Sequence, residues 1–370
     1  MNERFILVAV ILFFVILISE YVAYASFHQA GIIKSAQLEL ILMLAGIILP
    51  IIFIGSMVYG YKHYSLINSW LNTISSIWLG LVFYIFMASL LVFIFIMLNN
   101  YYGLHLPIKL ISNSLVLIVL FLMTYGVINA SNPKIVRLEI KLEKLAKDWE
   151  NKKIVLISDV HLGFIRKDIF LKNIIDKIEK EKPDVVFIAG DLINGEAFPY
   201  KKWLEEFSVL KPEYGILYVE GNHEKYSQEY EKFKSQIPDF INNITDKKVY
   251  INNTQIIGLD YKENQTKEQT NNRLTSLSYN KKETSIILMH DPKDTTFLSD
   301  QKVSLVLSGH THAGQFFPFN LVVNDIYKKY THGQSYTDQT TSYTSSGIGT
   351  SIIPIRIGTR PEIVVLTIKP

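Results

Sequence analysis

Four long apolar stretches occupy the first 132 residues of the chain. Each is long enough to cross a bilayer core of about 30 Å, which takes about 20 residues of helix. An all-buried helical domain is the alternative, but its helices would need polar faces, which these segments lack. The pattern therefore predicts four transmembrane helices, over residues 5–27, 38–60, 72–98 and 107–129.

The first stretch also has features of a secretory signal peptide. Arg4 precedes the apolar run, and Ala23-Tyr24-Ala25 has the form of a cleavage site. Glu20 lies just before that site and further apolar stretches follow at once, so we favour an uncleaved helix. The choice does not change the predicted topology. Four spans that start inside the cell and three spans that remain after cleavage both place the rest of the chain on the cytoplasmic side of the membrane.

Basic residues flank the spans unevenly. One side carries most of them, whereas the other carries only Lys34 and Lys109. Because loops rich in Lys and Arg stay in the cytoplasm, the segment after the fourth span is predicted to be cytoplasmic. The basic residues on that side are Arg4, Lys62, Lys134, Arg137, Lys141, Lys144 and Lys147.

A change of composition at Ser131-Asn132-Pro133 divides the chain into two predicted domains, residues 1–132 and 133–370. Charged residues are rare before it and ordinary in number after it. Over the whole chain, 37 Lys and Arg balance 34 Asp and Glu, so no nucleic acid partner is expected. The absence of cysteine excludes disulfides, thiolate metal sites and cysteine nucleophiles.

The second domain has the pattern of an α/β sheet. Residues 135–142 alternate apolar and charged side chains like a half-exposed strand, although a short amphipathic helix on the membrane is an alternative. Short apolar runs typical of strands buried on both faces follow, with a helical pattern at 169–178. The polar residues 261–283 are interpreted as a mobile surface insertion. The apolar runs are 154–157, 185–188, 216–219, 286–289 and 303–307.

A polar motif follows each of these five runs, at the strand end where open α/β sheets place their sites. The side chains include Asp, His and Asn, which suit manganese, iron or zinc. Two such ions about 3.5–4 Å apart activate water and hold a phosphoryl group. The motifs are Ser158-Asp159-Val160-His161, Gly190-Asp191, Gly221-Asn222-His223-Glu224, His290-Asp291-Pro292 and Gly309-His310-Thr311-His312.

In this order the motifs resemble the pattern of the calcineurin-like metallophosphoesterases. The resemblance covers about residues 135–370 and implies a four-layer α/β/β/α sandwich with two divalent metal ions, manganese being favoured. It implies that His223 acts as general acid or charge stabiliser toward the phosphate and that Glu224 holds its imidazole. It also implies one ion at Asp159, His161, Asp191 and His312, and a second at Asp191, Asn222, His290 and His310, with Asp191 bridging.

A finer pattern resembles one bacterial branch of this family. That branch includes membrane-anchored members and lipid-headgroup hydrolases such as UDP-2,3-diacylglucosamine pyrophosphatases. Ala313 stands where many of them have Gly, and Arg356 either binds substrate phosphate or forms a surface salt bridge. Residues 316–319 either reach toward lipid, line an acyl pocket or cover the core. The pattern comprises residues 309–315, Gly347-Ile348-Gly349-Thr350, Arg356 and Arg360-Pro361-Glu362.

The sequence therefore predicts an integral, multi-pass protein of the cell membrane whose cytoplasmic domain is a phosphohydrolase. The bond cleaved is a phosphoester or a pyrophosphate. A lipid-linked substrate is favoured, because a soluble substrate needs no membrane anchor. Two alternatives stay open: a hydrolase of cyclic nucleotides, nucleotides or phosphoproteins with the spans as sensor or tether, and a metal-binding scaffold without catalysis. The oligomeric state is left open.

Overall fold

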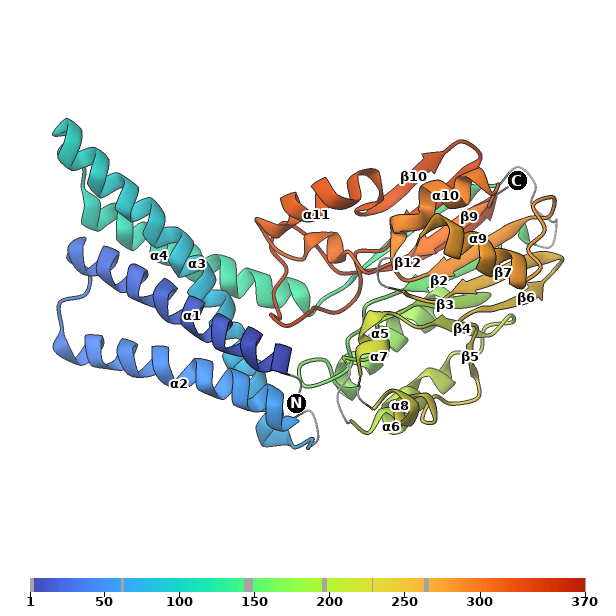
Figure 1. Ribbon diagram of the computed structural model, residues 1–370, viewed down its shortest axis with the longest axis horizontal. Helices are drawn as coiled ribbons and strands as arrows, with labels where there is room; N and C mark the ends of the chain where they lie inside the picture. Colours follow the sequence, from blue (N-terminus) through green and yellow to red (C-terminus); the bar gives the residue numbers. More distant parts are fainter. Residues whose placement is uncertain are drawn as a thin grey trace. The chain divides into compact units, whose positions relative to one another are not determined.

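The computed structural model describes residues 3–60, 63–142, 149–194, 198–227, 229–262 and 266–369. It divides into two compact units. The first comprises Met1–Ile128 with Ile352–Ile355, and the second comprises Asn129–Ser351 with Arg356–Pro370. Figure 1 shows long helices in the first unit and sheets flanked by helices in the second. Three of the basic residues used to predict the orientation, Lys62, Lys144 and Lys147, lie outside the described residues.

The first unit contains four helices that are long and apolar enough to cross a membrane. They are α1 (Glu3–Gln29), α2 (Ala36–Gly60), α3 (Leu66–Tyr102) and α4 (Ile108–Ala130). The four predicted apolar helices are thus confirmed, although α3 extends beyond its predicted bounds at both ends. With 37 residues, α3 is about 55 Å long, which exceeds the thickness of a bilayer core. The Ser65 side chain caps its start by accepting a hydrogen bond from the Asn68 backbone N–H.

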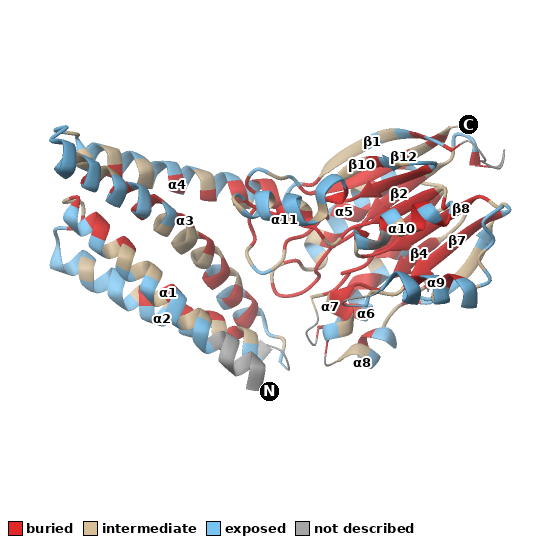
Figure 2. Ribbon diagram, turned by 45° about the horizontal axis from the view of Figure 1, so that its top comes forward, coloured by how far each residue is buried: buried red, intermediate tan, exposed pale blue. Residues whose placement is uncertain are grey.

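Large apolar side chains point outward from these helices. Ile18, Ile41, Leu117 and Phe121 are all well exposed, and Figure 2 shows exposed residues along much of α1, α2 and α4. A continuous apolar surface of this kind is unfavourable in water. In lipid it carries no such cost, because lipid tails are as apolar as these side chains.

Two six-stranded sheets form the framework of the second unit. The strands are β1 (Lys134–Lys141), β2 (Lys153–Ile157), β3 (Val185–Ala189), β4 (Ile216–Val219), β5 (Ile241–Asn243), β6 (Lys247–Ile251), β7 (Thr254–Leu259), β8 (Ser285–Met289), β9 (Leu305–Ser308), β10 (Gly333–Thr337), β11 (Thr340–Thr344) and β12 (Glu362–Lys369). One sheet has the order β1-β12-β2-β3-β4-β5 and the other β10-β11-β9-β8-β7-β6. Within them, β2 to β5 are parallel, and so are β7, β8 and β9.

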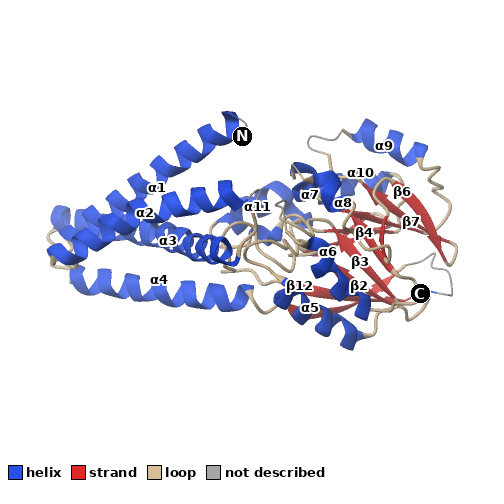
Figure 3. Ribbon diagram, turned by 90° about the horizontal axis from the view of Figure 1, so that it is seen from below, coloured by secondary structure: helices blue, strands red, loops and turns tan. Residues whose placement is uncertain are grey.

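The two sheets pack face to face over a shared apolar core. Alternate strand residues such as Leu156 and Leu288 belong to one buried cluster between the sheets. On the outer face of the second sheet, Ile287 packs with Leu274 and Leu298 of two covering helices. Figure 3 shows helices around the strands, which confirms the predicted helix–sheet–sheet–helix layers. The helices of this unit are α5 (Asp168–Glu181), α6 (Tyr200–Leu204), α7 (Asn222–Tyr226), α8 (Tyr230–Lys234), α9 (Lys267–Ser276), α10 (Thr295–Asp300) and α11 (Phe319–Tyr327).

The predicted strand at residues 135–142 is confirmed, and one other sequence interpretation needs correction. Residues 135–142 form the edge strand β1 and its following residue, so the alternative of a membrane-surface helix is wrong. Within residues 261–283, helix α9 covers the second sheet, capped at Thr266 and anchored by buried Leu274. Its other side chains are mostly polar, which hid the helix from the apolar pattern. Residues 263–265 of that stretch lie outside the described residues.

Candidate metal centre

All seven predicted ligand residues meet at one end of the sandwich. Because β2, β3 and β4 are parallel, and so are β8 and β9, their carboxyl ends share an edge of each sheet. The motif after each strand is therefore brought into the same small volume. Asp159 and His161 follow β2, Asp191 follows β3, Asn222 follows β4, His290 follows β8, and His310 and His312 follow β9.

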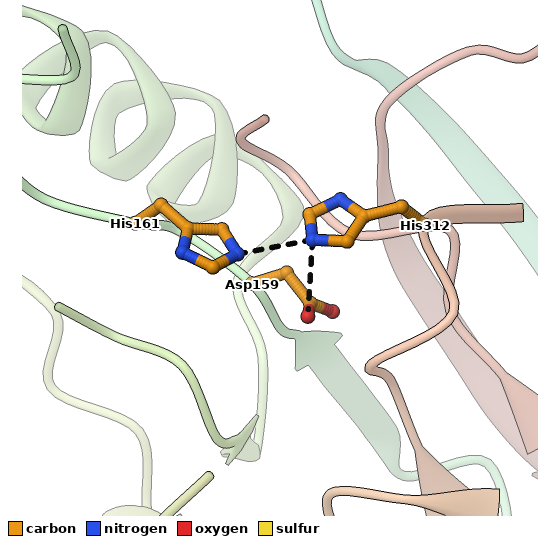
Figure 4. Close-up of side chains that lie close together, drawn as sticks. All are labelled: Asp159, His161 and His312. Carbon is orange, nitrogen blue, oxygen red and sulfur yellow. Dashed lines mark hydrogen bonds and ion pairs between the residues drawn. The ribbon is translucent and has the colours of Figure 1, made fainter. Parts of the chain in front are cut away.

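The first group of possible ligands consists of Asp159, His161 and His312 (Figure 4). The Nε2 atoms of His161 and His312 are 3.0 Å apart. His312 Nε2 also lies 3.5 Å from Asp159 Oδ1. All three side chains are buried. Three ligand atoms converging in this way can bind one divalent ion.

The second group is centred on His290, which approaches Asp191, Asn222 and His310. Its Nε2 atom lies 3.2 Å from Asp191 Oδ2 and 3.0 Å from both Asn222 Oδ1 and His310 Nδ1. Asp191 Oδ2 is also 3.8 Å from Nε2 of His161 in the first group. The carboxylate of Asp191 therefore lies between the two groups, where a bridging ligand would be required.

Backbone contacts orient these side chains. His290 Nδ1 donates to the Ala189 carbonyl oxygen at 2.8 Å, which in the neutral ring leaves Nε2 free as a ligand atom. Asp191 Oδ1 accepts the His223 backbone N–H at 2.9 Å. Asp159 Oδ2 accepts the backbone N–H of His310 at 3.0 Å. His290, Asp191 and Asp159 are thus held by the chain before any ion binds.

The protonation states suit a metal site. Burial lowers the pKa of His161 to about 3 and that of His310 to about 4. Burial, reinforced by the Arg356 guanidinium, also lowers the pKa of His312. Burial opposes the ionisation of Asp191, but the neighbouring histidines more than offset it and lower the pKa of this carboxyl. Neutral imidazoles beside an ionised carboxylate are the forms that bind divalent ions.

His290 differs from the other histidines. Burial alone would lower its pKa, but the carboxylates of Asp191 and Asp159 raise it to about 10. These carboxylates favour the protonated ring, so an ion that binds at Nε2 competes with a proton there.

Glycines pack closely against the ligand residues. A Cβ atom at Gly309 would lie 2.5 Å from the Ser158 Cβ and 2.6 Å from Asp159 Oδ2. One at Gly347 would lie 2.7 Å from the Asp159 Cβ. The Asp159 side chain thus fits only because Gly309 and Gly347 have no side chain.

We expect Gly309→Ala to lower metal affinity about 10–100-fold, the usual effect of disturbing a group that orients a metal ligand. The added methyl would collide with Asp159, and the loop would have to shift. Isothermal titration with manganese measures the effect. Gly55→Ala is the control, because a Cβ atom there meets nothing within 4 Å. Equal affinities for the two variants would contradict the close packing.

Several ligand residues adopt a left-handed backbone. Their φ angles are 52° at Asp159, 51° at His161, 51° at Asp191, 72° at His310 and 50° at His312. For residues with a Cβ atom this conformation costs roughly 1–2 kcal/mol each. Such strain is tolerated where the surroundings enforce it, and it concentrates at functional sites.

His223 lies beside the ligands with its side chain partly exposed. Its ring centroid is 4.6 Å from that of His161, and its ring nitrogen falls within one possible ligand group with His161 and Asp191. It is therefore placed where it could touch a phosphate bound at the centre.

Glu224 does not contact that imidazole in the structure. Its carboxylate accepts backbone N–H groups of Asp191, Ile193 and Gly221 at 3.0, 3.1 and 2.7 Å. Both oxygens are thus engaged by the loops that carry the ligands, so the expected support of the His223 ring is replaced by support of the backbone.

Arg356 has neither of the roles considered for it. It is 0% exposed, which excludes a surface salt bridge. Nη1 donates to the His312 carbonyl at 2.6 Å, and Nη2 donates to the carbonyls of Ser346 and Gly349 at 2.7 Å. The guanidinium therefore ties the last ligand loop to the segment before β12 rather than offering its hydrogens to a phosphate.

Two tyrosines beside the centre escaped the sequence analysis. The Tyr261 ring centroid is 6.1 Å from that of His290 and 5.9 Å from that of His310. The Tyr327 ring centroid is 6.2 Å from that of His310. Tyr261 comes just after β7. A search of the residues that follow each predicted strand would have included it if Thr254–Leu259 had been recognised as a strand.

Comparison with known proteins finds relatives of this chain. The family model described as calcineurin-like phosphoesterase matches residues 152–314. The chain is 30% identical over 273 residues to an uncharacterised metallophosphoesterase of Campylobacter jejuni, covering 69% of each chain. It is also 30% identical over 268 residues to a transmembrane protein with a metallophosphoesterase domain from Danio rerio, covering 68% of this chain and 61% of that one.

A further relative, an uncharacterised metallophosphoesterase of Helicobacter pylori, is 33% identical over 250 residues, or 65% of each chain. The chain thus spans about two thirds of the length of these curated relatives. Among solved structures, a dimetal phosphatase from Danio rerio aligns with 59% of this chain and 99% of its own, at 14% identity and a TM-score of 0.36.

Proposed function

Because this chain belongs to the calcineurin-like phosphoesterase family, and so is a metal-dependent phosphoester hydrolase, we propose that its substrate is a lipid-linked phosphoester or pyrophosphate. The observation that carries the proposal is the pair of buried ligand groups that meet at Asp191. The four long apolar helices support the lipid-linked substrate, because helices of this length and composition would anchor the hydrolase domain at a membrane.

We assign the ligands of the two divalent ions as follows. Asp191 is shared, His290 and His310 belong with Asn222, and the remaining three residues form the other set. When bound, two such ions supply a nucleophile from water at neutral pH and neutralise charge on the phosphoryl group. Manganese is our first choice of ion, with iron and zinc as alternatives. The other set is Asp159, His161 and His312.

His223 is assigned as the general acid. Its backbone N–H binds Asp191 Oδ1, so the turn that carries it is fixed to the shared carboxylate. Its partly exposed ring can therefore meet the leaving oxygen while the ligand side chains stay buried. Glu224 supports this site by holding the backbone at Asp191, Ile193 and Gly221.

We expect His223→Ala to lower kcat about a hundredfold for a substrate with an alkyl leaving group, which is typical of a lost general acid. The loss should be much smaller for p-nitrophenyl esters, because p-nitrophenolate leaves without a proton. Rates for the two leaving groups, measured at equal metal content, separate this role from a structural one. Equal losses for both leaving groups would contradict it.

For the membrane arrangement, we propose a transmembrane domain over residues 1–132 and a cytoplasmic hydrolase domain over 133–370. The uneven basic residues around the apolar helices support this orientation. Cleavage of a protease site placed after Gly31, in the loop between α1 and α2, tests it. In sealed spheroplasts that site should be cut by external protease while the hydrolase domain is protected.

The full-length protein in detergent tests the reaction. After removal of metals, it should regain hydrolysis of bis-p-nitrophenyl phosphate or p-nitrophenyl phosphate when manganese, iron, zinc or magnesium is added. Comparison of p-nitrophenyl hexadecyl phosphate in mixed micelles with p-nitrophenyl methyl phosphate then tests the lipid preference. Faster turnover of cyclic nucleotides or phosphopeptides than of the hexadecyl ester would refute the lipid-linked substrate. Metal binding without turnover of any ester would identify a scaffold.

A further inference from the structure

Helix α11, which follows the last ligand motif, carries an exposed apolar face. Every residue of α11 is described, and none is buried. Phe319, Val322 and Ile326 are 45%, 55% and 59% exposed. These positions are spaced by three and four residues, so they share one side of the helix. We call these three side chains the α11 apolar face; exposed Phe317 and Leu321 flank it.

Both ends of α11 are fixed to the metal centre. At its start, a side chain at Gly314 would collide with the Asn320 backbone, so the helix packs directly on the loop of His312. At its end, the Tyr327 ring lies next to the ring of His310. A molecule that lies along α11 would therefore have one of its ends beside the predicted ligands, next to Tyr327 and His310.

Three lysines lie near the C-terminal end of α11, and one of them, Lys293, pairs with Asp291 at 3.4 Å. Lys293 Nζ lies 5.7 Å from the centroid of the Tyr327 ring. Lys328 and Lys329 follow the helix at once, and both are exposed. Apolar residues on one face with lysines at the edge are typical of helices that lie in a membrane interface, where lysines meet anionic headgroups.

We infer that the α11 apolar face inserts into the surface of the lipid bilayer and that the Tyr327 end guides the headgroup of a lipid-linked phosphoester to the metal centre. The second part rests on the proposed function. A bilayer is the occupant we choose because the same chain carries four helices apolar enough to lie in one. A protein partner is the weaker choice. Each partner of a stable protein complex buries roughly 800 Å², and the three side chains of the α11 apolar face cover much less than that.

Site-directed spin labelling tests the insertion, and the chain suits it because it contains no cysteine. Val322→Cys labels the α11 apolar face, and Ile169→Cys labels an apolar residue of α5 that is 74% exposed. The full-length protein is placed in vesicles of phosphatidylcholine and phosphatidylglycerol. Oxygen should speed the relaxation of the label at 322, and a water-soluble nickel chelate should have little effect on it. At 169 the nickel chelate should speed the relaxation more than oxygen does.

A label at 322 that is as accessible to nickel as the one at 169 would overturn the insertion. So would a label at 322 that neither reagent reaches, because that label would be covered by protein. Neither result depends on which ester the enzyme cleaves, so the insertion can fail or succeed independently of the proposed function.

An activity measurement tests the guidance of substrate. The rate for p-nitrophenyl hexadecyl phosphate in vesicles is divided by the rate for p-nitrophenyl methyl phosphate, which has the same leaving group. A charge in the interface weakens helix binding, so Val322→Asp and Ile326→Asp should each lower this ratio about tenfold or more. The control Ile169→Asp should leave it unchanged. An unchanged ratio in all three variants, with the label at 322 inserted, would overturn the guidance.

Discussion

Replacement of Asp191 by Asn is expected to lower kcat at least about a thousandfold, because the variant loses the charge shared by both ligand groups. A pair of ions contributes several kcal/mol to phosphoryl transfer, and about 4 kcal/mol corresponds to a thousandfold. The amide keeps the shape of the side chain and can still accept the His223 backbone N–H. The change therefore removes charge and leaves the local hydrogen bond in place.

The metal content of the Asp191→Asn protein should fall together with its activity. Elemental analysis after dialysis measures the ions, and hydrolysis of bis-p-nitrophenyl phosphate measures the rate. Asp176→Asn, at an exposed position of α5, is the matched control and should retain both. If the Asp191 variant kept two ions and its full rate, Asp191 would not be the bridging ligand.

The second large effect is expected on stability, from Arg356→Met. The variant has an apolar side chain of similar length but leaves the carbonyls of Ser346 and Gly349 without a donor, whereas the His312 carbonyl keeps the Gln315 N–H. Buried groups that lose their partner cost about 1–3 kcal/mol each. A total of at least about 2 kcal/mol should lower the Tm by roughly 4–8 °C for a domain of this size.

Thermal unfolding of the full-length protein, followed by intrinsic fluorescence in one detergent, measures this shift. Arg137→Met is the control, since the Arg137–Glu181 ion pair has an arginine side chain that is 63% exposed. Loss of such a surface pair costs about 1 kcal/mol or less. A Tm shift no larger than that of the control would show that the carbonyls of Ser346 and Gly349 find other donors.

The sequence predicts that the candidate ligands gather at one place because its information is local. Each ligand stands within a few residues of a continuous apolar run, and parallel strands bring their carboxyl ends together without help from distant features. The helices of the first unit are predicted for a similar reason, since a long apolar stretch leaves few choices of structure.

The contacts that the sequence does not predict depend on parts of the chain far from the motifs. Arg356 lies 44 positions after His312, and only the folded chain shows that its donors point at the carbonyls of the last ligand loop. Glu224 stands next to His223, yet its carboxylate turns away to the backbone of Asp191 and Ile193. The family resemblance implied a contact with the neighbouring imidazole. In the folded chain the buried backbone N–H groups need an acceptor, and the Glu224 carboxylate supplies it.

The place of β12 in the first sheet has a consequence for how the protein is made. β12 lies between β1 and β2, pairing parallel to β1 from Lys134↔Glu362 onward and antiparallel to β2. During synthesis, β1 emerges directly after α4 but must wait for more than two hundred further residues before its neighbour exists. The ribosome thus releases the apolar helices to the membrane well before the first sheet can close. Because such distant pairings form slowly, we expect chaperones to meet this domain with an open sheet edge at β2.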